Sequence, residues 1–151
     1  MASVEDLATL TVHPVGRVEN AEHDARRVDW SGVRSVVRLH DGLGEALLGL
    51  DDYTHVIVLG WLHEYPAELR ERRSAYPAGD DRLPLQGALA LRGARPNPIS
   101  VTVCRLRRVD GDTLEVEGLD LVDGTPVLDV KPYIAHYDAV PKARIPKWAG
   151  G

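Results

Sequence analysis

The densest group of side chains able to hold a ligand lies in residues 91–99, which read Leu-Arg-Gly-Ala-Arg-Pro-Asn-Pro-Ile. The two prolines restrict the backbone on either side of Asn97 and push Arg95 and Asn97 toward extended conformations. A rigid loop of this kind can hold two guanidinium groups and a carboxamide at fixed angles. The same residues also fit a stiff turn between two strands with its arginines in solvent, and composition alone favours that turn.

A second group of charged residues lies in 118–133, which read Gly-Leu-Asp-Leu-Val-Asp-Gly-Thr-Pro-Val-Leu-Asp-Val-Lys-Pro-Tyr. Asp120, Asp129 and Lys131 stand within or beside apolar stretches, where a charge must be paired or functional. A hairpin with capping aspartates at the Asp123-Gly124 turn explains them as well. The acids lack the spacing of a calcium loop and a matching pair of histidines, so we expect no metal site.

Missing motifs disfavour several other chemistries. The chain has no Gly-x-Gly-x-x-Gly, no phosphate-binding Gly-rich loop and no Gly-x-Ser-x-Gly, so Rossmann-type cofactor binding and acyl-enzyme chemistry are unsupported. Cys104 is the single cysteine, which excludes a disulfide framework within one chain. His55 and His63 flank the most apolar run, but a histidine at a strand end is more often structural than catalytic.

The elements that must position these residues are predicted to be mainly β. Period-two and β-branched runs recur between turn signals, whereas helical spacing is rare. A short helix is expected over residues 41–50 and a charged surface excursion over 64–82. Because a closed sheet leaves no long unpaired edge, we expect a small closed or partly closed β-barrel with a few short helices. Strands are predicted at residues 10–18, 33–39, 54–63, 87–91, 99–109, 113–119 and 125–130.

The length and composition fit one globular domain. The chain has 151 residues, 44% of them apolar, and we assign all of 1–151 to one domain with a core over about 10–138 and a tail over 139–151. No apolar run approaches the ~20 residues that cross a bilayer. The opening residues lack the basic start and apolar middle of a signal peptide. We therefore expect a cytoplasmic protein without membrane contact.

Charge is distributed unevenly. The net charge of −5 argues against non-specific adhesion to nucleic acid as the main activity. Between Tyr65 and Arg108, however, nine arginines stand against four acidic residues. Most of these arginines are expected to solvate loops and strand edges, but a focused basic face would suit an anionic partner such as RNA.

Several motifs together resemble the TsaA-like, or TrmO, family over about residues 10–138. The most specific are Arg-Pro-Asn-Pro-Ile at 95–99 and Leu-Asp-Leu-Val-Asp-Gly-Thr-Pro-Val-Leu-Asp-Val-Lys-Pro-Tyr at 119–133. His-Pro-Val-Gly-Arg-Val at 13–18, Leu-Gly-Leu-Asp-Asp-Tyr-Thr-His-Val-Ile-Val-Leu at 48–59, His63 and Arg92 complete the pattern in the family's order. The loop after Arg92 is one residue shorter than the common family pattern.

The resemblance implies a small β-barrel that binds S-adenosylmethionine without a Rossmann fold and forms a homodimer. Characterised members methylate the N6 nitrogen of threonylcarbamoyl-adenosine beside the anticodon of tRNA. Because the sulfonium already makes the methyl group electrophilic, catalysis needs no metal and rests on positioning. The residues carried over to the cofactor pocket are His63, Glu64, Arg92, Ser100, Val101, Leu119, Asp120, Leu121, Val122 and Asp123.

Within that implied site, Arg92 would pair with the methionine carboxylate, and Asp120 and Asp123 would suit the ribose hydroxyls or the amino group. The acceptor side is assigned to Arg95, Asn97 and Lys131. For catalysis we expect Tyr133 to offer an aromatic surface and Asp129 to take the N6 proton, with His63 as the rival base. Alternatively, Asp129 and Lys131 pair with each other and Tyr133 only packs.

Two other functions stay open from the sequence. One is methyl transfer to a small molecule, because longer tRNA-modifying members carry an additional C-terminal domain; the other is a cofactor-binding module without turnover. A tRNA enzyme should present the arginines at 70, 72 and 73 beside the pocket mouth, whereas a small-molecule enzyme should close that mouth.

Overall fold

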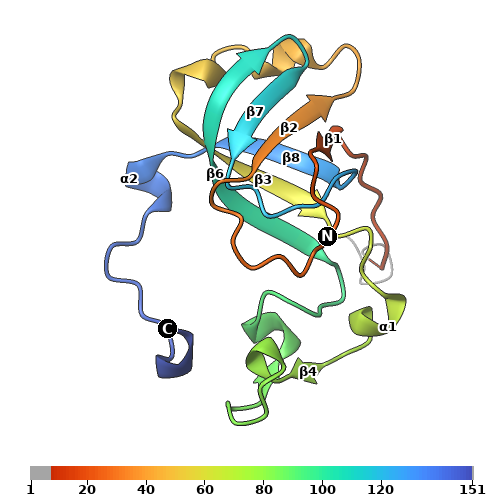
Figure 1. Cartoon of the computed structure of the whole chain (residues 1–151), viewed down its shortest axis with the longest axis vertical. Helices are drawn as coiled ribbons and strands as arrows, with labels where there is room; N and C mark the ends of the chain where they lie inside the picture. The colour runs from red at the N-terminus through yellow and green to blue at the C-terminus, as the bar shows by residue number, and fades with distance from the viewer. Residues whose placement is uncertain (1–7, 151) are drawn as a thin grey trace.

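Six antiparallel strands close into a barrel in the order β1-β2-β7-β6-β3-β8 (Figure 1). The computed structural model describes residues 8–150. The closed barrel with few short helices confirms the predicted fold class. The barrel strands are β1 (Gly16–Glu19), β2 (Arg34–Leu39), β3 (His55–Trp61), β6 (Ile99–Asp110), β7 (Thr113–Glu117) and β8 (Pro126–Pro132).

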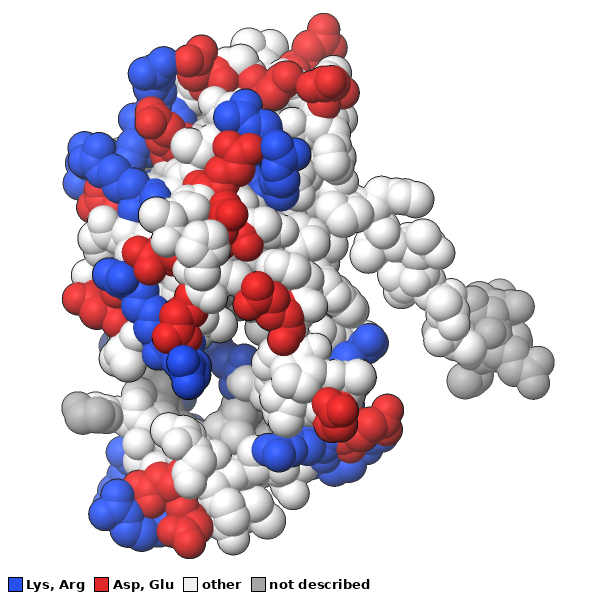
Figure 2. Space-filling model, turned by 45° about the vertical axis from the view of Figure 1, so that its right-hand side comes forward, with Lys and Arg blue, Asp and Glu red and all other residues white. Residues whose placement is uncertain are grey.

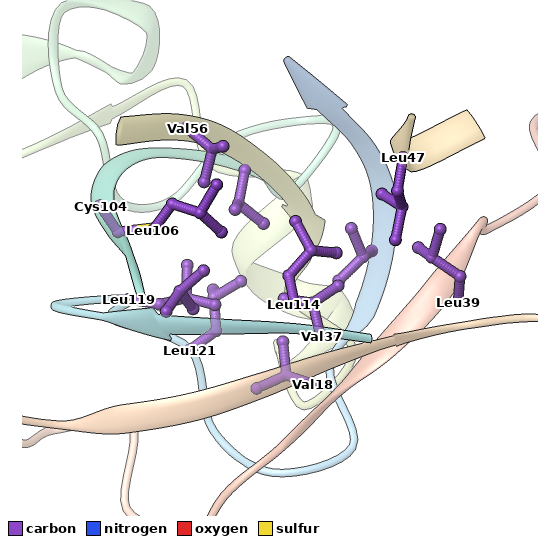
Figure 3. Close-up of a cluster of buried hydrophobic side chains, with 13 residues drawn as sticks. Val18, Val37, Leu39, Leu47, Val56, Cys104, Leu106, Leu114, Leu119 and Leu121 are labelled. Atoms are coloured by element: carbon purple, nitrogen blue, oxygen red, sulfur yellow. The ribbon is translucent and has the colours of Figure 1, made fainter. Parts of the chain in front are cut away.

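The barrel interior is filled by aliphatic side chains from alternate positions of the strands (Figure 3). In β3, for example, Val56 and Val58 are fully buried while their neighbours are not. Alternation of this kind places one set of side chains inside, and β-branched residues fit the pleated surface well. The other fully enclosed members of the core are Val18, Val37, Leu114, Val116, Leu119 and Val127.

The first half of β6 has its apolar residues on the outside. Ile99, Val101 and Val103 are 41%, 47% and 51% exposed, while Ser100 and Thr102 alternate with them. Beside them, β3 turns its half-buried Ile57, Leu59 and Trp61 outward, in register with the β6 residues. We call these six residues the outer face of β3 and β6.

Residues 62–98 form an insertion between β3 and β6, and this insertion contains the surface excursion predicted over 64–82. It holds α1 (Ala67–Arg70), β4 (Ser74–Ala75), η3 (Pro77–Gly79), β5 (Gln86–Gly87) and η4 (Ala88–Ala90). The strand predicted over 87–91 is wrong. Only Gln86 and Gly87 pair with β4. The next three residues have no partner strand, and Ala88–Ala90 form the 3₁₀ helix η4 instead.

The remaining elements are short. The helix expected over 41–50 is instead two 3₁₀ helices, η1 (Gly44–Leu47) and η2 (Leu50–Asp52). The backbone between them is not helical, with a ψ of 122° at Leu48 and a φ of 86° at Gly49. After β8 come α2 (Ala135–Asp138) and η5 (Lys147–Ala149) in an otherwise extended tail, drawn blue in Figure 1.

Among residues 8–150, no helix is long and apolar enough to cross a membrane. The residues on which the expectation of no signal peptide rested, 1–6, lie outside the described part of the chain.

Candidate functional site

A cavity of about 380 Å³ lies at the end of the barrel where β3 leads into the insertion and β6 leads out of it. We call it the barrel-end cavity. The strand register Trp61↔Ile99 and Gly60↔Ser100 places the two ends of the insertion side by side. Its lining comprises Ala25, Leu62, His63, Glu64, Tyr65, Arg92, Arg95, Ile99, Ser100, Val101, Asp120, Leu121, Val122 and Thr125.

A close approach at Gly60 shapes the floor of this cavity. A Cβ at that position would lie 2.7 Å from Leu121 Cδ1 and 2.9 Å from Ser100 Oγ. The Gly60 amide donates a hydrogen bond to Ser100 Oγ at 3.2 Å. The absence of a side chain at Gly60 therefore lets the loop carrying Leu121 pack against β3 and β6.

Residues 119–123 enter the cavity only in part. Leu121 and Val122 line it with largely buried side chains, and Asp120 accepts a hydrogen bond from the Thr102 hydroxyl. Leu119 instead belongs to the barrel core. Asp123 does not line the cavity. Its carboxylate accepts a hydrogen bond from the backbone amide of Asn20 at 3.1 Å. Of the ten residues carried over to a cofactor pocket, Leu119 and Asp123 are thus the two that do not line the cavity.

Asn20 holds this loop in place. Its side-chain amide donates to the Leu121 carbonyl and to Ser35 Oγ, both at 2.9 Å, and its own carbonyl oxygen accepts from the Glu22 amide at 2.9 Å. Sequence reasoning missed Asn20, because it stands in a polar stretch that looked like a plain loop.

The two arginines of the Arg-Gly-Ala-Arg loop play different parts. Arg95 donates to the backbone carbonyls of Leu91, Ala88 and Gly93, the last two at 3.4 Å, so its guanidinium braces the loop. Arg92 also lines the cavity. Within residues 8–150 its guanidinium makes no hydrogen bond or ion pair, which leaves its donors available for an anion.

His63 and Glu64 stand at the cavity wall, with His63 Nε2 and Glu64 Oε1 4.0 Å apart. Tyr65, the next residue, also lines the barrel-end cavity. Burial raises the pKa of Tyr65, and the nearby Arg95 and Arg72 guanidinium groups oppose that rise. The cavity thus combines carboxylates, an imidazole and an unpaired guanidinium with apolar walls.

Besides Leu119 and Asp123, four predicted site residues lie outside this cavity. Asn97 is on the outer side of its loop, near Arg70, which donates to the Pro96 carbonyl at 2.6 Å. Lys131 Nζ and Asp129 Oδ2 are 2.8 Å apart, the pairing that the sequence offered as the alternative to a catalytic role. Asp129 shares a row of the sheet with Leu59 and Val101, which puts it two strand spacings, about 10 Å, from the cavity wall.

Tyr133 is the farthest of the four. Its amide bonds to the His55 carbonyl at 3.1 Å, and its ring meets His55 edge-on with centroids 6.3 Å apart. His55 lies four residues before Leu59, the β3 residue that pairs with Val101 of the cavity wall, so about 13 Å of strand separates Tyr133 from the cavity.

A second, more open cavity of about 860 Å³ lies within the insertion. We call it the insertion cavity. It shares Tyr65 and Arg92 with the barrel-end cavity, so the two adjoin. Figure 2 shows a hollow between the barrel and the smaller part of the molecule below it, with both basic and acidic side chains around it. The other charged and aromatic residues that line the insertion cavity are Arg72, Arg73, Tyr76 and Trp148.

Only part of the insertion cavity had a sequence signal. The excess of arginine between residues 65 and 108 pointed to a basic region, and Arg72, Arg73 and Arg92 are part of it. Nothing in the spacing linked Tyr76 or Trp148 to them, because Trp148 stands in a tail more than fifty positions from Arg92.

Comparisons with known proteins point to one family. A probable S-adenosyl-L-methionine-binding protein of Archaeoglobus fulgidus is 41% identical over 133 residues, 87% of this chain and 34% of that protein. A mouse tRNA (adenine(37)-N6)-methyltransferase is 37% identical over 95 residues, 62% of this chain and 22% of that protein. The chain thus spans about a third or less of the length of these two curated relatives.

A solved structure agrees with the sequence matches. The crystal structure of TrmO from Pseudomonas aeruginosa superposes with a TM-score of 0.72 at 31% identity, covering 90% of this chain and 61% of that one. The family model for the tRNA-methyltransferase O N-terminal domain matches residues 23–139, a span that contains all residues of the barrel-end cavity. The chain therefore belongs to the TrmO family, as a relative of its N-terminal domain.

Proposed function

We propose that the chain binds S-adenosylmethionine in the barrel-end cavity and transfers its methyl group to the N6 nitrogen of threonylcarbamoyl-adenosine beside the anticodon of tRNA. One observation carries the proposal: every residue assigned to the cofactor except Leu119 and Asp123 lines this single cavity. The names of the relatives support it, since they bind S-adenosylmethionine or methylate adenine in tRNA.

The residues present suit that cofactor. The unpaired guanidinium of Arg92 can hold a carboxylate with a charge-assisted fork. Asp120 and Glu64 can accept hydrogen bonds from ribose hydroxyls or an amino group. Leu121, Val122 and the other apolar lining residues offer the surface that an adenine ring and a methylene chain require.

The chemical step then needs positioning and one proton acceptor. When bound, S-adenosylmethionine supplies an electrophilic methyl group on its sulfonium. His63 Nε2 lies at the cavity wall beside Glu64 and is placed to accept the proton that the attacking nitrogen loses. Within one chain the geometry favours His63 over Asp129 for this role, because the Asp129 carboxylate is bound to Lys131 on the barrel's outer surface.

The openness of the site favours tRNA over a small acceptor. A tRNA enzyme was expected to present Arg70, Arg72 and Arg73 beside the pocket mouth, and Arg70 lines neither cavity. Arg72 and Arg73 line the insertion cavity, which adjoins the barrel-end cavity at Tyr65 and Arg92. A cytoplasmic location follows from the same proposal, because that is where the proposed substrate is found.

The decisive experiment mixes the purified protein and labelled S-adenosylmethionine with total tRNA from cells that lack the protein. Nucleoside mass spectrometry should then show label on threonylcarbamoyl-adenosine, and His63→Ala should lower its rate of formation more than Asp129→Asn. No labelled nucleoside would overturn the proposed activity, and label on another nucleoside would overturn the proposed acceptor.

We also propose a homodimer formed through the outer face of β3 and β6. Six aliphatic or aromatic residues without a charged member make this face self-complementary, as a symmetric contact requires. The face continues into the barrel-end cavity through Ile99 and Val101, so a second copy seated there would cover the edge of each cofactor site.

Val103 tests the dimer, because it lies on this face but outside the cavity. Light scattering should give a dimer mass for the wild type and a monomer mass for Val103→Glu. The control Val28→Glu, at a position 95% exposed and off this face, should stay dimeric. A monomeric wild type across a wide concentration range would rule the dimer out.

A further inference from the structure

We propose that the insertion cavity is a nucleotide-binding site that takes the acceptor region of a single-stranded RNA loop, and that Trp148 of the C-terminal tail is one of its binding residues. The inference rests on the proposed function, which it extends by assigning the site for the acceptor. Three independent features of the cavity support it.

The first feature is charge. Arg72, Arg73 and Arg92 line the insertion cavity, and among residues 8–150 no Asp or Glu does. Within residues 8–150, Arg72 and Arg92 make no hydrogen bond or ion pair, and the guanidinium of Arg73 donates only to the Glu71 carbonyl at 3.2 Å. With Arg92 assigned to the cofactor carboxylate, the guanidinium groups of Arg72 and Arg73 give this chain of net charge −5 a local site for phosphate groups.

The second feature is the aromatic lining. Tyr65, Tyr76 and Trp148 contribute rings to the same cavity, among the aliphatic side chains of Leu69, Leu83, Leu85 and Leu91. A cavity lined by both aromatic rings and arginines suits a splayed-out single strand, because each base has a flat face to stack and each nucleotide has a phosphate to neutralise.

The third feature is the junction with the barrel-end cavity. Methyl transfer requires the attacking nitrogen within about 3–3.5 Å of the methyl carbon. Tyr65 and Arg92 line both cavities, so a base held in the insertion cavity reaches the cofactor site there. The flanking nucleotides then lie against Arg72, Arg73 and the outer rings.

The tail contributes through Trp148. Its neighbours from 139 to 147 are all exposed, whereas Trp148 is half-buried against the insertion. The same tail carries Lys142, Arg144 and Lys147 and no acidic residue after Asp138. Trp148 thus brings a basic segment beside the cavity, where it adds attraction for a polyanion.

The test measures RNA binding and cofactor binding separately on the full chain. The probe is a fluorescent anticodon stem-loop RNA with threonylcarbamoyl-adenosine beside the anticodon, titrated by anisotropy without cofactor. Trp148→Ala and Arg72→Ala should each raise the Kd for the RNA by about tenfold, the usual loss of affinity for one stacking ring or one phosphate contact. Trp148→Phe should restore most of the affinity, because it keeps a ring.

Salt dependence separates the two roles. Arg72→Ala should lower the magnitude of the slope of log K against log salt by about 0.7, whereas Trp148→Phe, which keeps a ring to hold the basic tail beside the cavity, should leave it unchanged. The matched controls are Arg82→Ala in the insertion and Tyr137→Ala near the tail, both exposed and outside the cavity. Neither should change RNA affinity, and no variant at position 72 or 148 should change the calorimetric Kd for S-adenosylmethionine.

The outcomes distinguish this inference from the proposed function. If the wild type does not bind the RNA, or if Trp148→Ala and Arg72→Ala bind it as tightly as the controls, the inference is overturned even when the wild type methylates tRNA. If those variants lose RNA affinity as expected while the wild type transfers no methyl group, the nucleotide site stands and the proposed activity fails.

Discussion

The barrel and the insertion are held together in different ways. In the barrel, alternate strand positions bury valine and leucine completely, and each strand has two bonded neighbours. In the insertion the only buried residues are Pro77, Ala88 and Pro98, and arginine side chains bonded to backbone carbonyls brace the chain instead. A rigid frame therefore holds the barrel-end cavity, while a thinly packed segment with lower local stability surrounds the insertion cavity.

The largest expected effect tests the frame itself. Leu114→Ala removes a fully buried side chain from the core and should lower the free energy of unfolding by about 2–5 kcal/mol. Leu89→Ala, in the insertion at a position 79% exposed, should change it by less than about 0.5 kcal/mol. Urea denaturation measures both, and similar losses would contradict the division into a packed barrel and a thinly packed insertion.

Arg95 tests whether the insertion can loosen without the barrel. Arg95→Ala removes the donors to the Ala88, Leu91 and Gly93 carbonyls, a loss of about 1.5–3 kcal/mol of local stability. Hydrogen exchange by mass spectrometry should speed up about tenfold or more in residues 88–95 and stay unchanged in β3 and β6. The exposed Arg26→Ala should alter neither region. Equally faster exchange in the strands would show that the two regions unfold together.

The buried thiol of Cys104 makes the stability of the barrel depend on pH. Burial raises the pKa of this thiol from 9.0 to about 12, so the unfolded chain loses the thiol proton first as pH rises. The stability contribution is complete below pH 9 and is lost above it, by at most about 1.4 kcal/mol per pH unit until pH 12. Denaturation from pH 8 to 11 should show this fall, and Cys104→Ala should lack it.

The same thiol offers a simpler check. At pH 8 a thiol-alkylating reagent should label Cys104 in urea and hardly at all in the folded protein, because the reactive thiolate is scarce and buried. Labelling of the native protein at the rate of the unfolded chain would mean that the barrel opens far more readily than its packing implies.

The barrel was largely predictable because its strands repeat a two-residue pattern that packing enforces. The same pattern misled at residues 87–91, where alternating alanine and leucine had no partner strand beyond Gly87. It also could not tell inside from outside in β6, where Ser100 and Thr102 face inward and Ile99, Val101 and Val103 face out. Which face of a strand is buried depends on the strands that close the barrel around it.

The residues of the candidate site that belong to sequence motifs were predictable. His63, Arg92 and Asp120 come from distant segments and do meet in one cavity. Leu119 and Asp123 belong to the same motif but point away, because neighbouring residues of a loop face different sides. Tyr133 lies beside the start of β3, whereas the cavity lies toward the other end of that strand, a separation that linear order does not reveal. Trp148 joins the insertion only through tertiary contact.

The most direct test of the central claim is calorimetric titration of S-adenosylmethionine into the wild type, Arg92→Ala and Arg34→Ala. Arg34 is an exposed arginine of β2, 3.6 Å from Glu117 and outside both cavities. If Arg92 holds the cofactor carboxylate, Arg92→Ala should bind about 10- to 100-fold more weakly, corresponding to about 1.5–3 kcal/mol, and Arg34→Ala should match the wild type. Equal affinity in all three proteins would contradict the assignment of the barrel-end cavity.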